Sequence, residues 1–166
     1  MTRQDEFVDR FGSVFEHSPW VAERAFPAID SQRLSVGAVH AAMVEAFRAA
    51  SEAERMQVLR AHPDLAGRLA IAGGLTADSK AEQASAGLDR LTPEEHQRFT
   101  TLNAIYTDKF GFPFIIAVKG LTKTDILSAF ESRVDNGVDQ EFETAAAEVE
   151  KIALLRLTSM LPGDSE

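Results

Sequence analysis

His62 is the histidine in this sequence whose neighbours most suggest chemistry. It lies in Ala61-His62-Pro63-Asp64, and Pro63 disfavours helix at the residue before it, so a helix should end at His62. An imidazole held at a helix end beside a rigid turn can donate or accept a proton near neutral pH. The alternative is a solvent-facing histidine in a helix-loop-helix turn, which the local pattern alone favours.

A second candidate is the stretch Ser79-Lys80-Ala81-Glu82-Gln83, which follows the loop from Gly73 to Asp78. It can be a capping box in which Ser79 and Glu82 cap a helix reciprocally. It can also place a carboxylate and an amide near exposed helical N–H groups, which favour an anion or a carbonyl oxygen. The spacing alone favours the capping box.

The last helix carries an arginine on an otherwise apolar face. Residues at steps of three and four share this face: Phe142, Ala145, Val149, Ile152, Arg156 and Ser159. Since an unpaired buried charge is costly, Arg156 needs either an internal Asp or Glu or a substrate carboxylate held by its bidentate fork. The sequence does not choose between them. Arg133 is expected to be a cation at a helix C-terminus.

The segment FGFPFIIAVKG, Phe110 to Gly120, contains a β-branched apolar run in a chain that otherwise has helical periodicity. Its backbone N–H and C=O groups need partners, and no second strand is predicted to supply them. Loop contacts, water or a bound ligand remain as candidates. We expect the ligand to pair these groups, with Phe112 and Phe114 helping to exclude water.

The remaining pattern predicts an all-α fold. Capping boxes begin helices at Ser51 and Thr92, and another helix is expected to start at Thr122. The helix from Thr92 is expected to end at Gly111, and the helix from Thr122 near Asn136-Gly137. Further helices are expected within 34–50 and from 138 to 161. We therefore predict one domain over residues 1–166, with about seven or eight helices and one extended non-sheet segment near 112–118.

Composition excludes several classes of protein. A net charge of -9 argues against nucleic acid and against an anionic membrane surface as partners. The absence of cysteine excludes disulfides, Cys-zinc sites and thiol nucleophiles. No metal motif and no apolar run of membrane-spanning length occur, and the polar N-terminus does not suggest a secretory signal. We expect a cytoplasmic protein without a metal site.

These pieces, taken together and in order, resemble the OHCU decarboxylase family, whose substrate is 2-oxo-4-hydroxy-4-carboxy-5-ureidoimidazoline (OHCU). The likeness covers most of the chain. Its motifs are 15–21 (FEHSPWV), 62–68 (HPDLAGR), 79–83 (SKAEQ), 86–88 (AGL), 91–92 (LT), 106–115 (YTDKFGFPFI), 119–120 (KG), 148–153 (EVEKIA) and 156–157 (RL).

The resemblance implies roles for individual residues. His62 would be the catalytic acid, Glu82 the catalytic carboxylate, and Arg156 the arginine of the last helix that meets the substrate. The substrate-binding residues that it implies are Pro63, Ser79, Lys80, Ala81, Glu82, Gln83, Phe114, Ile115, Ile116, Ala117 and Val118. Which of Arg156, Arg133 and Arg68 contacts the substrate stays open.

The resemblance also implies an activity. The family is all-helical, cofactor-free and usually homodimeric, and it decarboxylates OHCU, a ureidoimidazoline carboxylate, to (S)-allantoin in the last step of urate oxidation. Some relatives carry a fused transthyretin-like domain, for which this chain is too short. The alternatives are a non-catalytic helical module that binds a purine-derived ligand or a protein partner, and an enzyme acting on a related ureido or imidazoline acid.

Overall fold

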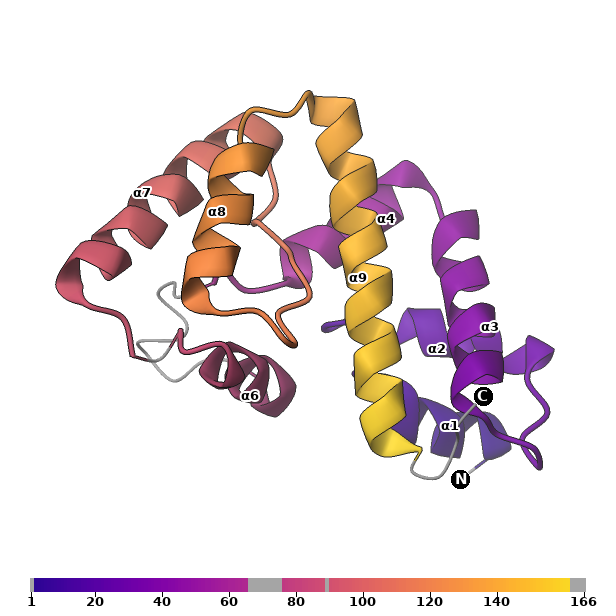
Figure 1. The fold of residues 1–166 in the computed structure, drawn as a ribbon. Coiled ribbons are helices and arrows are strands. Elements are labelled where there is room, and N and C mark those ends of the chain that lie inside the picture. The colour runs from indigo at the N-terminus through magenta and orange to yellow at the C-terminus, as the bar shows by residue number, and fades with distance from the viewer. Residues whose placement is uncertain (1, 66–75, 89, 162–166) are drawn as a thin grey trace. The chain divides into compact units, whose positions relative to one another are not determined.

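The computed structural model describes residues 2–65, 76–88 and 90–161, and these residues form helices and connecting segments without a strand (Figure 1). The elements are α1 (Arg3–Phe11), α2 (Trp20–Ala25), the 3-10 helix η1 (Phe26–Ala28), α3 (Val36–Ala49), α4 (Glu52–Ala61), α6 (Ala77–Ser85), α7 (Pro93–Phe110), α8 (Lys123–Arg133) and α9 (Val138–Met160). Eight α-helices in the described part confirm the predicted all-α class. No helix among these residues is long and apolar enough to cross a membrane.

Local capping chemistry explains where several helices begin and end. Reciprocal hydrogen bonds join Ser51 to Glu54 and Thr92 to Glu95, as predicted. A third box joins Thr122 to Asp125 at the start of α8. Gly111 ends α7 with a left-handed φ of 80°, which glycine adopts without the steric cost of a side chain.

Two predicted helix ends are wrong. The N-cap of α6 is Thr76, whose hydroxyl accepts the Ser79 N–H at 3.2 Å, so Ser79 lies inside the first turn and does not cap the helix with Glu82. Further along the chain, α8 ends at Arg133, about one turn before the predicted stop near Asn136. The sequence offered two hydroxyls within four residues at α6, and spacing did not identify the capping one.

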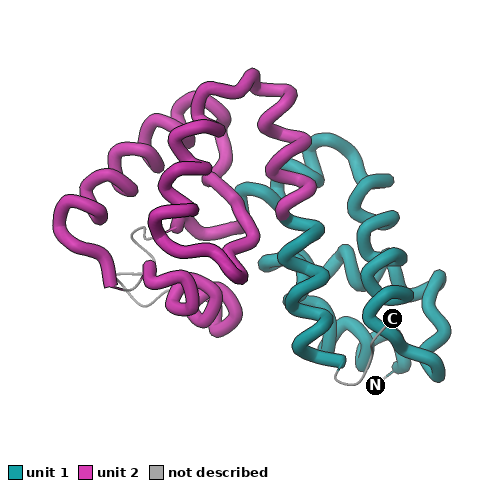
Figure 2. The backbone as a smooth tube through the Cα atoms, in the orientation of Figure 1, with its two compact units in different colours: residues 1–61, 149–166 teal, residues 62–148 magenta. Residues whose placement is uncertain are grey.

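The chain divides into two compact units, one of residues 1–61 and 149–166 and one of residues 62–148 (Figure 2). Helix α9 contributes its first part to the second unit and the rest to the first. In unit 1, aromatic rings of α1, α3 and the segment after α1 form the core, with Phe7 and Phe11 4.9 Å apart and Phe15 and Phe47 5.3 Å apart. The prediction of one domain over residues 1–166 stays a prediction.

Unit 2 has an aromatic core centred on Tyr106, which is fully buried in α7. Its ring lies 4.5–5.8 Å from four other rings, those of Phe110, Phe112, Phe114 and Phe130. Phe114 also stacks face to face on Phe130 of α8 at 4.0 Å. Two of these phenylalanines come from the irregular segment after α7, so this core anchors the side chains of that segment.

Candidate functional site

His62 lies directly after the last residue of α4, where Pro63 was predicted to stop the helix. Its side chain is buried, with a residue exposure of 8%, so the expectation of a solvent-facing histidine is wrong. The carbonyls of Asp64 and Leu65, which follow Pro63, accept hydrogen bonds from side chains. Gln83 of α6 donates to the Asp64 carbonyl at 3.4 Å, and Asn103 of α7 donates to the Leu65 carbonyl at 3.0 Å.

Helix α6 turns one face toward the interior of unit 2. Ser79 and Gln83 are buried and Glu82 is half-buried, which is the spacing of one helical face. Lys80 and Ala81 lie on the exposed face. Because Gln83 bonds to the His62-Pro63-Asp64 turn, the structure brings together two of the stretches that the sequence singled out.

The Asp64 carboxyl is a further titratable group in this turn. It is half-buried, and loss of water around it raises its pKa above the ordinary value for aspartate. A proton on this carboxyl is therefore held more tightly than on an exposed aspartate. The turn thus contains an acid beside the predicted catalytic histidine.

The segment of residues 112–118 is irregular, and three of its backbone groups are paired. The Val118 carbonyl accepts the Leu121 N–H at 2.9 Å, and the other two groups bond to side chains. The Arg133 guanidinium donates from Nη1 to the Ile115 carbonyl at 2.7 Å, and the Ala117 N–H donates to Glu148 Oε1 at 2.9 Å. The expectation that a ligand alone pairs this backbone is therefore wrong at these positions. Within the described residues, the N–H and C=O of Ile116 have no hydrogen-bond partner.

Phe112 and Phe114 are each 1% exposed and pack in the aromatic core of unit 2. They exclude water from the interior on which the segment rests. Ile116 and Ala117 are the half-buried residues of the run, between buried Ile115 and buried Val118. Ile116 thus combines partial exposure with unpaired backbone groups.

Arg133 is the centre of a buried polar network. Its Nε donates to Glu141 Oε2 at 2.8 Å, while Nη2 lies 2.6 Å from the same oxygen, close enough for an ion pair but not aligned for a hydrogen bond. Asn136 donates to the other carboxylate oxygen at 2.9 Å, and the Tyr106 hydroxyl makes a short hydrogen bond to Oε2. Burial and the Glu141 carboxylate raise the pKa of Tyr106 far above the ordinary value.

Arg156 lies in unit 1, and its partner there is a carboxylate. Its Nη1 is 2.8 Å from Glu16 Oε1 and also within 3.3 and 3.4 Å of the Ser13 and Val14 carbonyls. Both side chains of the ion pair are almost fully buried. Of the two partners that the sequence left open, the structure shows the internal carboxylate. The predicted substrate contact of Arg156 stays a prediction, and Arg68 lies outside the described residues.

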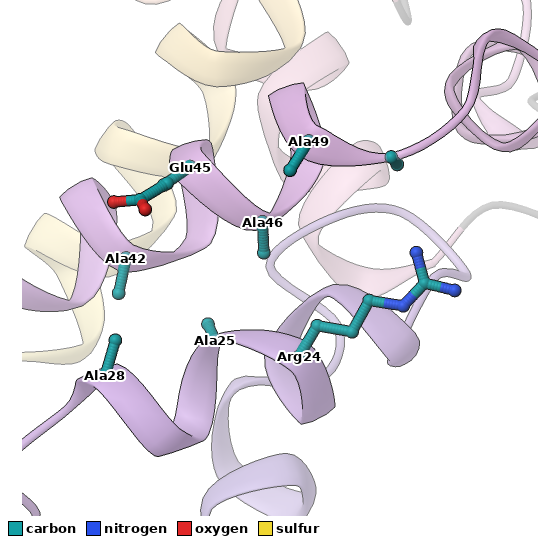
Figure 3. A pocket seen from close by; sticks show the side chains of 8 residues that line it. Arg24, Ala25, Ala28, Ala42, Glu45, Ala46 and Ala49 are labelled. Carbon is teal, nitrogen blue, oxygen red and sulfur yellow. The ribbon is translucent and has the colours of Figure 1, made fainter.

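A cavity of about 290 Å³ lies elsewhere, between α2, η1 and α3 of unit 1 (Figure 3). Alanines line most of it, with Arg24 and Glu45 as its charged residues. No predicted site residue contributes to it, and Arg24 is already paired with Glu54 through two hydrogen bonds. In the described part of the chain, no group of three or more His, Asp and Glu side chains could hold a metal ion.

Sequence reasoning missed the roles of Arg133 and Glu148. Arg133 was expected to be a helix-end cation, yet it bonds to the backbone of the predicted substrate-binding segment. Glu148 occurs in one of the family-like motifs but had no role assigned. The available signal was the unpaired backbone of residues 112–118, because a lone extended segment needs polar side chains beside it.

An all-helical fold with a buried histidine in a turn bonded to a glutamate-bearing helix has the features of a small helical enzyme. A family model described as OHCU decarboxylase matches residues 1–158. The chain belongs to the OHCU decarboxylase family, as the motifs of the sequence suggested. It is therefore a decarboxylase, a carboxy-lyase, and its family does not support the alternative of a non-catalytic module.

Named relatives match at high coverage. The chain is 45% identical over 157 residues to the 2-oxo-4-hydroxy-4-carboxy-5-ureidoimidazoline decarboxylase of Halalkalicoccus jeotgali, covering 95% of this chain and 86% of the relative. Identity to the Haloferax volcanii protein of the same name is 47% over 158 residues, covering 92% and 88%. A uric acid degradation bifunctional protein of Bacillus sp. is 40% identical over 92% of this chain, which spans 29% of that longer protein.

Solved structures share the fold. The crystal structure of (S)-allantoin synthase superposes with a TM-score of 0.74 at 32% identity, covering 96% of this chain and 51% of that one, so this chain spans about half of that protein. An OHCU decarboxylase crystallised in the presence of (S)-allantoin gives a TM-score of 0.70 at 22% identity, covering 96% and 98%. The second match supports the fold alone.

Proposed function

We propose that this chain decarboxylates 2-oxo-4-hydroxy-4-carboxy-5-ureidoimidazoline to (S)-allantoin in urate degradation. The observation that carries the proposal is the family match over residues 1–158, together with relatives named for this reaction that align over nearly their whole length. A small-molecule substrate is consistent with the family, and unit 2 contains the candidate residues for binding it: buried His62, half-buried Glu82 and the Ile116 backbone groups.

The substrate itself can accept the electrons of the reaction. When the bond to the carboxylate breaks, CO₂ leaves and an electron pair stays on the ring carbon. The adjacent C=N bond of the imidazoline ring takes up that pair as a ring C=C bond forms. One proton then adds to the neighbouring carbon that bears the ureido group, and the hydroxyl on the decarboxylated carbon loses its proton to become the carbonyl of allantoin. The protein must orient the scissile carboxylate out of the ring plane and deliver the proton to one face, which accounts for a single enantiomer.

His62 is the residue proposed to deliver the proton. An imidazole gains and loses a proton near neutral pH, and burial in the turn after α4 restricts it to one orientation. Glu82, on the inward face of α6, would hold a substrate hydroxyl or N–H or orient His62. Ser79 and Gln83 share that face and would line the same pocket.

The backbone of residues 114–118 is proposed to bind the ring or the ureido amides. Free peptide groups can pair with a planar amide-like ligand as an exposed strand edge pairs with a peptide. Ile116 offers both a donor and an acceptor for this purpose. The predicted contact with Arg156 would supply a cation for an anionic or carbonyl group of the substrate.

An optical assay tests the function. Uricase and the preceding hydrolase generate the unstable substrate in the cuvette, and circular dichroism follows the appearance of (S)-allantoin. The chain should accelerate the reaction and give one enantiomer. A rate and product no different from the spontaneous, racemising reaction would exclude this function, and a faster reaction with a related ureido acid would reassign the substrate.

A histidine pair tests the proton donor. His62→Ala should lower kcat by about 10²–10⁴-fold, the usual contribution of a general acid or base. His96→Gln in α7 is the matched control and should keep wild-type activity, since His96 belongs to none of the motifs. A folded His62→Ala protein with full activity would remove His62 from the mechanism.

Family resemblance also predicts a homodimer, and the composition of the chain predicts a cytoplasmic location. Sedimentation equilibrium of the purified chain tests the first, with a mass of twice 18.1 kDa expected for the dimer. Fractionation of cells expressing the chain tests the second.

A further inference from the structure

Two charged side chains form hydrogen bonds with the backbone of the predicted substrate-binding segment. One bonds to the residue before Ile116 and the other to the residue after it. Arg133 at the end of α8 binds the Ile115 carbonyl at 2.7 Å. Glu148 of α9 accepts the Ala117 N–H at 2.9 Å. Both contacts involve an ionised partner, and such hydrogen bonds are stronger than neutral ones.

The Arg133 contact is rigidly supported. Its carboxylate partner Glu141 is fully buried and is also bonded by Tyr106 and Asn136. The guanidinium carbon lies 4.5 Å from the centre of the Phe114 ring, so the arginine touches the segment through a side chain as well as through the backbone. Arg133 is therefore held by Glu141 and by the Phe114 ring. Because the guanidinium cannot move freely, its hydrogen bond fixes the position of the Ile115 carbonyl.

The spacing of the two contacts determines what is left for a ligand. In a planar trans peptide the C=O of one residue and the N–H of the next point in opposite directions, so the Ile116 N–H points away from the Ile115 carbonyl and the Ile116 C=O away from the Ala117 N–H. Ile115 and Ala117 are both bonded by protein side chains, whereas the Ile116 groups between them have no partner in the described residues. This alternation favours a segment anchored on one edge and open on the other.

We propose that Arg133 and Glu148 are positioning residues. They bond residues 115 and 117 on the side that faces away from the substrate, so that the Ile116 N–H and C=O form the edge that pairs with the substrate. The inference rests on the proposed function, because it assigns the protein support for the same binding site. Neither residue needs to touch the substrate. Their effect is to fix the edge before the substrate arrives, which reduces the ordering that binding requires.

A pair of Glu148 substitutions tests the role. Glu148→Ala removes the acceptor of the Ala117 N–H, whereas Glu148→Gln keeps an oxygen at the same distance and removes only the charge. Asp139→Ala, an exposed acidic position in the same helix, is the matched control. Two quantities are measured in each protein: amide hydrogen exchange at residues 115–117 without ligand, and kcat and KM in the coupled optical assay.

In Glu148→Ala we expect exchange of the Ala117 amide to accelerate and KM to rise roughly tenfold, with kcat nearly unchanged. Glu148→Gln should recover most of both values, and Asp139→Ala should match the wild type. The split between KM and kcat separates positioning from a general loss of folded protein, which would lower the apparent kcat instead.

Three results would overturn the proposal. The first is faster exchange with an unchanged KM, which would make the contact purely structural. The second is an unchanged exchange rate in Glu148→Ala. The third is a fall in kcat at constant KM, which would place Glu148 in the chemistry itself. The wild-type rate decides the proposed function, whereas the ratio of variant to wild type decides the positioning role, so the two failures are distinct.

Discussion

Arg156 in unit 1 and Arg133 in unit 2 are both arginines whose charge is compensated largely away from water, but in different surroundings. Each is a nearly buried arginine paired with a carboxylate of its own unit, Glu16 in the first case and Glu141 in the second. Each also donates to backbone carbonyls. Arg156 binds those of Ser13 and Val14 in the segment after α1, whereas Arg133 binds that of Ile115.

The two carboxylates differ in which parts of the chain they connect. Glu141 is bonded by Arg133, Tyr106 and Asn136, which occupy both of its oxygens. Glu16 has Arg156 at one oxygen and the exposed His17 ring 3.9 Å from the other. The Glu141 network therefore ties α7, α8 and α9 of unit 2 to residue 115. The difference shows that the position of an arginine in a sequence pattern does not identify the groups to which it bonds.

The largest predicted effect concerns the two carboxylates. Removing one partner of a buried ion pair leaves an uncompensated charge, at a cost of about 3–5 kcal/mol. We expect Glu141→Ala to lie at the upper end of this range, because Tyr106 and Asn136 also lose their acceptor, and Glu16→Ala to fall within it, because Arg156 loses its carboxylate. Urea unfolding followed by circular dichroism measures both.

Glu141→Gln serves as the control for size, since it keeps an acceptor oxygen and removes only the charge. Its loss of stability should be smaller than that of Glu141→Ala. If Glu141→Gln proves as costly as Glu141→Ala, the retained acceptor oxygen contributes nothing to Tyr106 and Asn136, and the network around Glu141 is not what stabilises unit 2.

The next effect separates the two arginines by activity. Lysine keeps the charge but loses the planar fork, so hydrogen bonds to the charged group worth about 1.5–3 kcal/mol are at stake. Arg133→Lys should raise KM with little change in kcat, as a positioning residue does. Arg156→Lys should lower kcat/KM by roughly tenfold or more if the predicted substrate contact is correct.

Thermal unfolding of both lysine variants shows whether enough folded protein remains for the comparison. Full activity in a less stable Arg156→Lys protein would leave Arg156 as the structural partner of Glu16 alone. Wild-type KM in Arg133→Lys would mean that the Ile115 carbonyl needs no anchor.

A third effect tests the open edge that Arg133 supports. Ile116→Pro removes the Ile116 N–H, and a net hydrogen bond of about 0.5–1.5 kcal/mol corresponds to a rise in KM of up to roughly tenfold. Ile116→Val keeps the peptide group and should bind the substrate as the wild type does. Titration with (S)-allantoin, followed by the shift in unfolding temperature, gives a second measure without turnover. Equal affinities of the two variants would exclude a backbone contact at this position.

Much of this arrangement was predictable from local patterns. The capping boxes at Ser51 and Thr92, the helix start at Thr122 and the stop at Gly111 follow from short-range chemistry, and the structure confirms them. The burial of Arg156 followed from helical periodicity. What could not be predicted is long-range pairing. The partners of Arg156 and Glu148 lie 140 and 31 residues away along the chain, and no periodicity connects them.

The residues of the candidate site also fall into those that local sequence patterns predicted and those that depend on long-range pairing. His62 and the face of Ser79, Glu82 and Gln83 came from motifs that are contiguous in sequence, and the structure bonds Gln83 to the His62 turn. The burial of His62 was not apparent, because Pro63 predicts where the helix ends but not which elements cover the turn. Arg133 does lie at the end of α8, as predicted, but its partners were not apparent for a related reason. A cation at a helix end is usual, and only the fold shows that Glu141 and residue 115 surround it.

The smallest predicted effect concerns the ion pair of Arg24 and Glu54, which is more exposed than the pairs formed by Arg133 and Arg156. Arg24 and Glu54 form two hydrogen bonds at 3.0 and 2.6 Å, yet their side chains are 47% and 34% exposed. The Arg24 hydrogen bond, helped by the Ser51 amide, lowers the pKa of Glu54 from 4.5 to about 2. Since the folded pKa is the lower one, the unfolded state takes up the proton first as the pH falls. The contribution of this pair to stability is therefore complete above pH 4.5 and is lost as the pH falls toward 2.

Arg24→Met should move the pKa of Glu54 back up, but not fully to 4.5, because the Ser51 amide still bonds the carboxylate. Carboxyl NMR titration of both proteins measures this shift. The unfolding temperature of the variant should fall only slightly below that of the wild type at neutral pH, since solvent screens an exposed pair, and the difference should vanish below pH 2. A pKa near 4.5 for Glu54 in the wild type would show that the pair does not persist in solution. A large loss of stability at neutral pH would show instead that burial is not what distinguishes the Arg156 and Arg133 pairs.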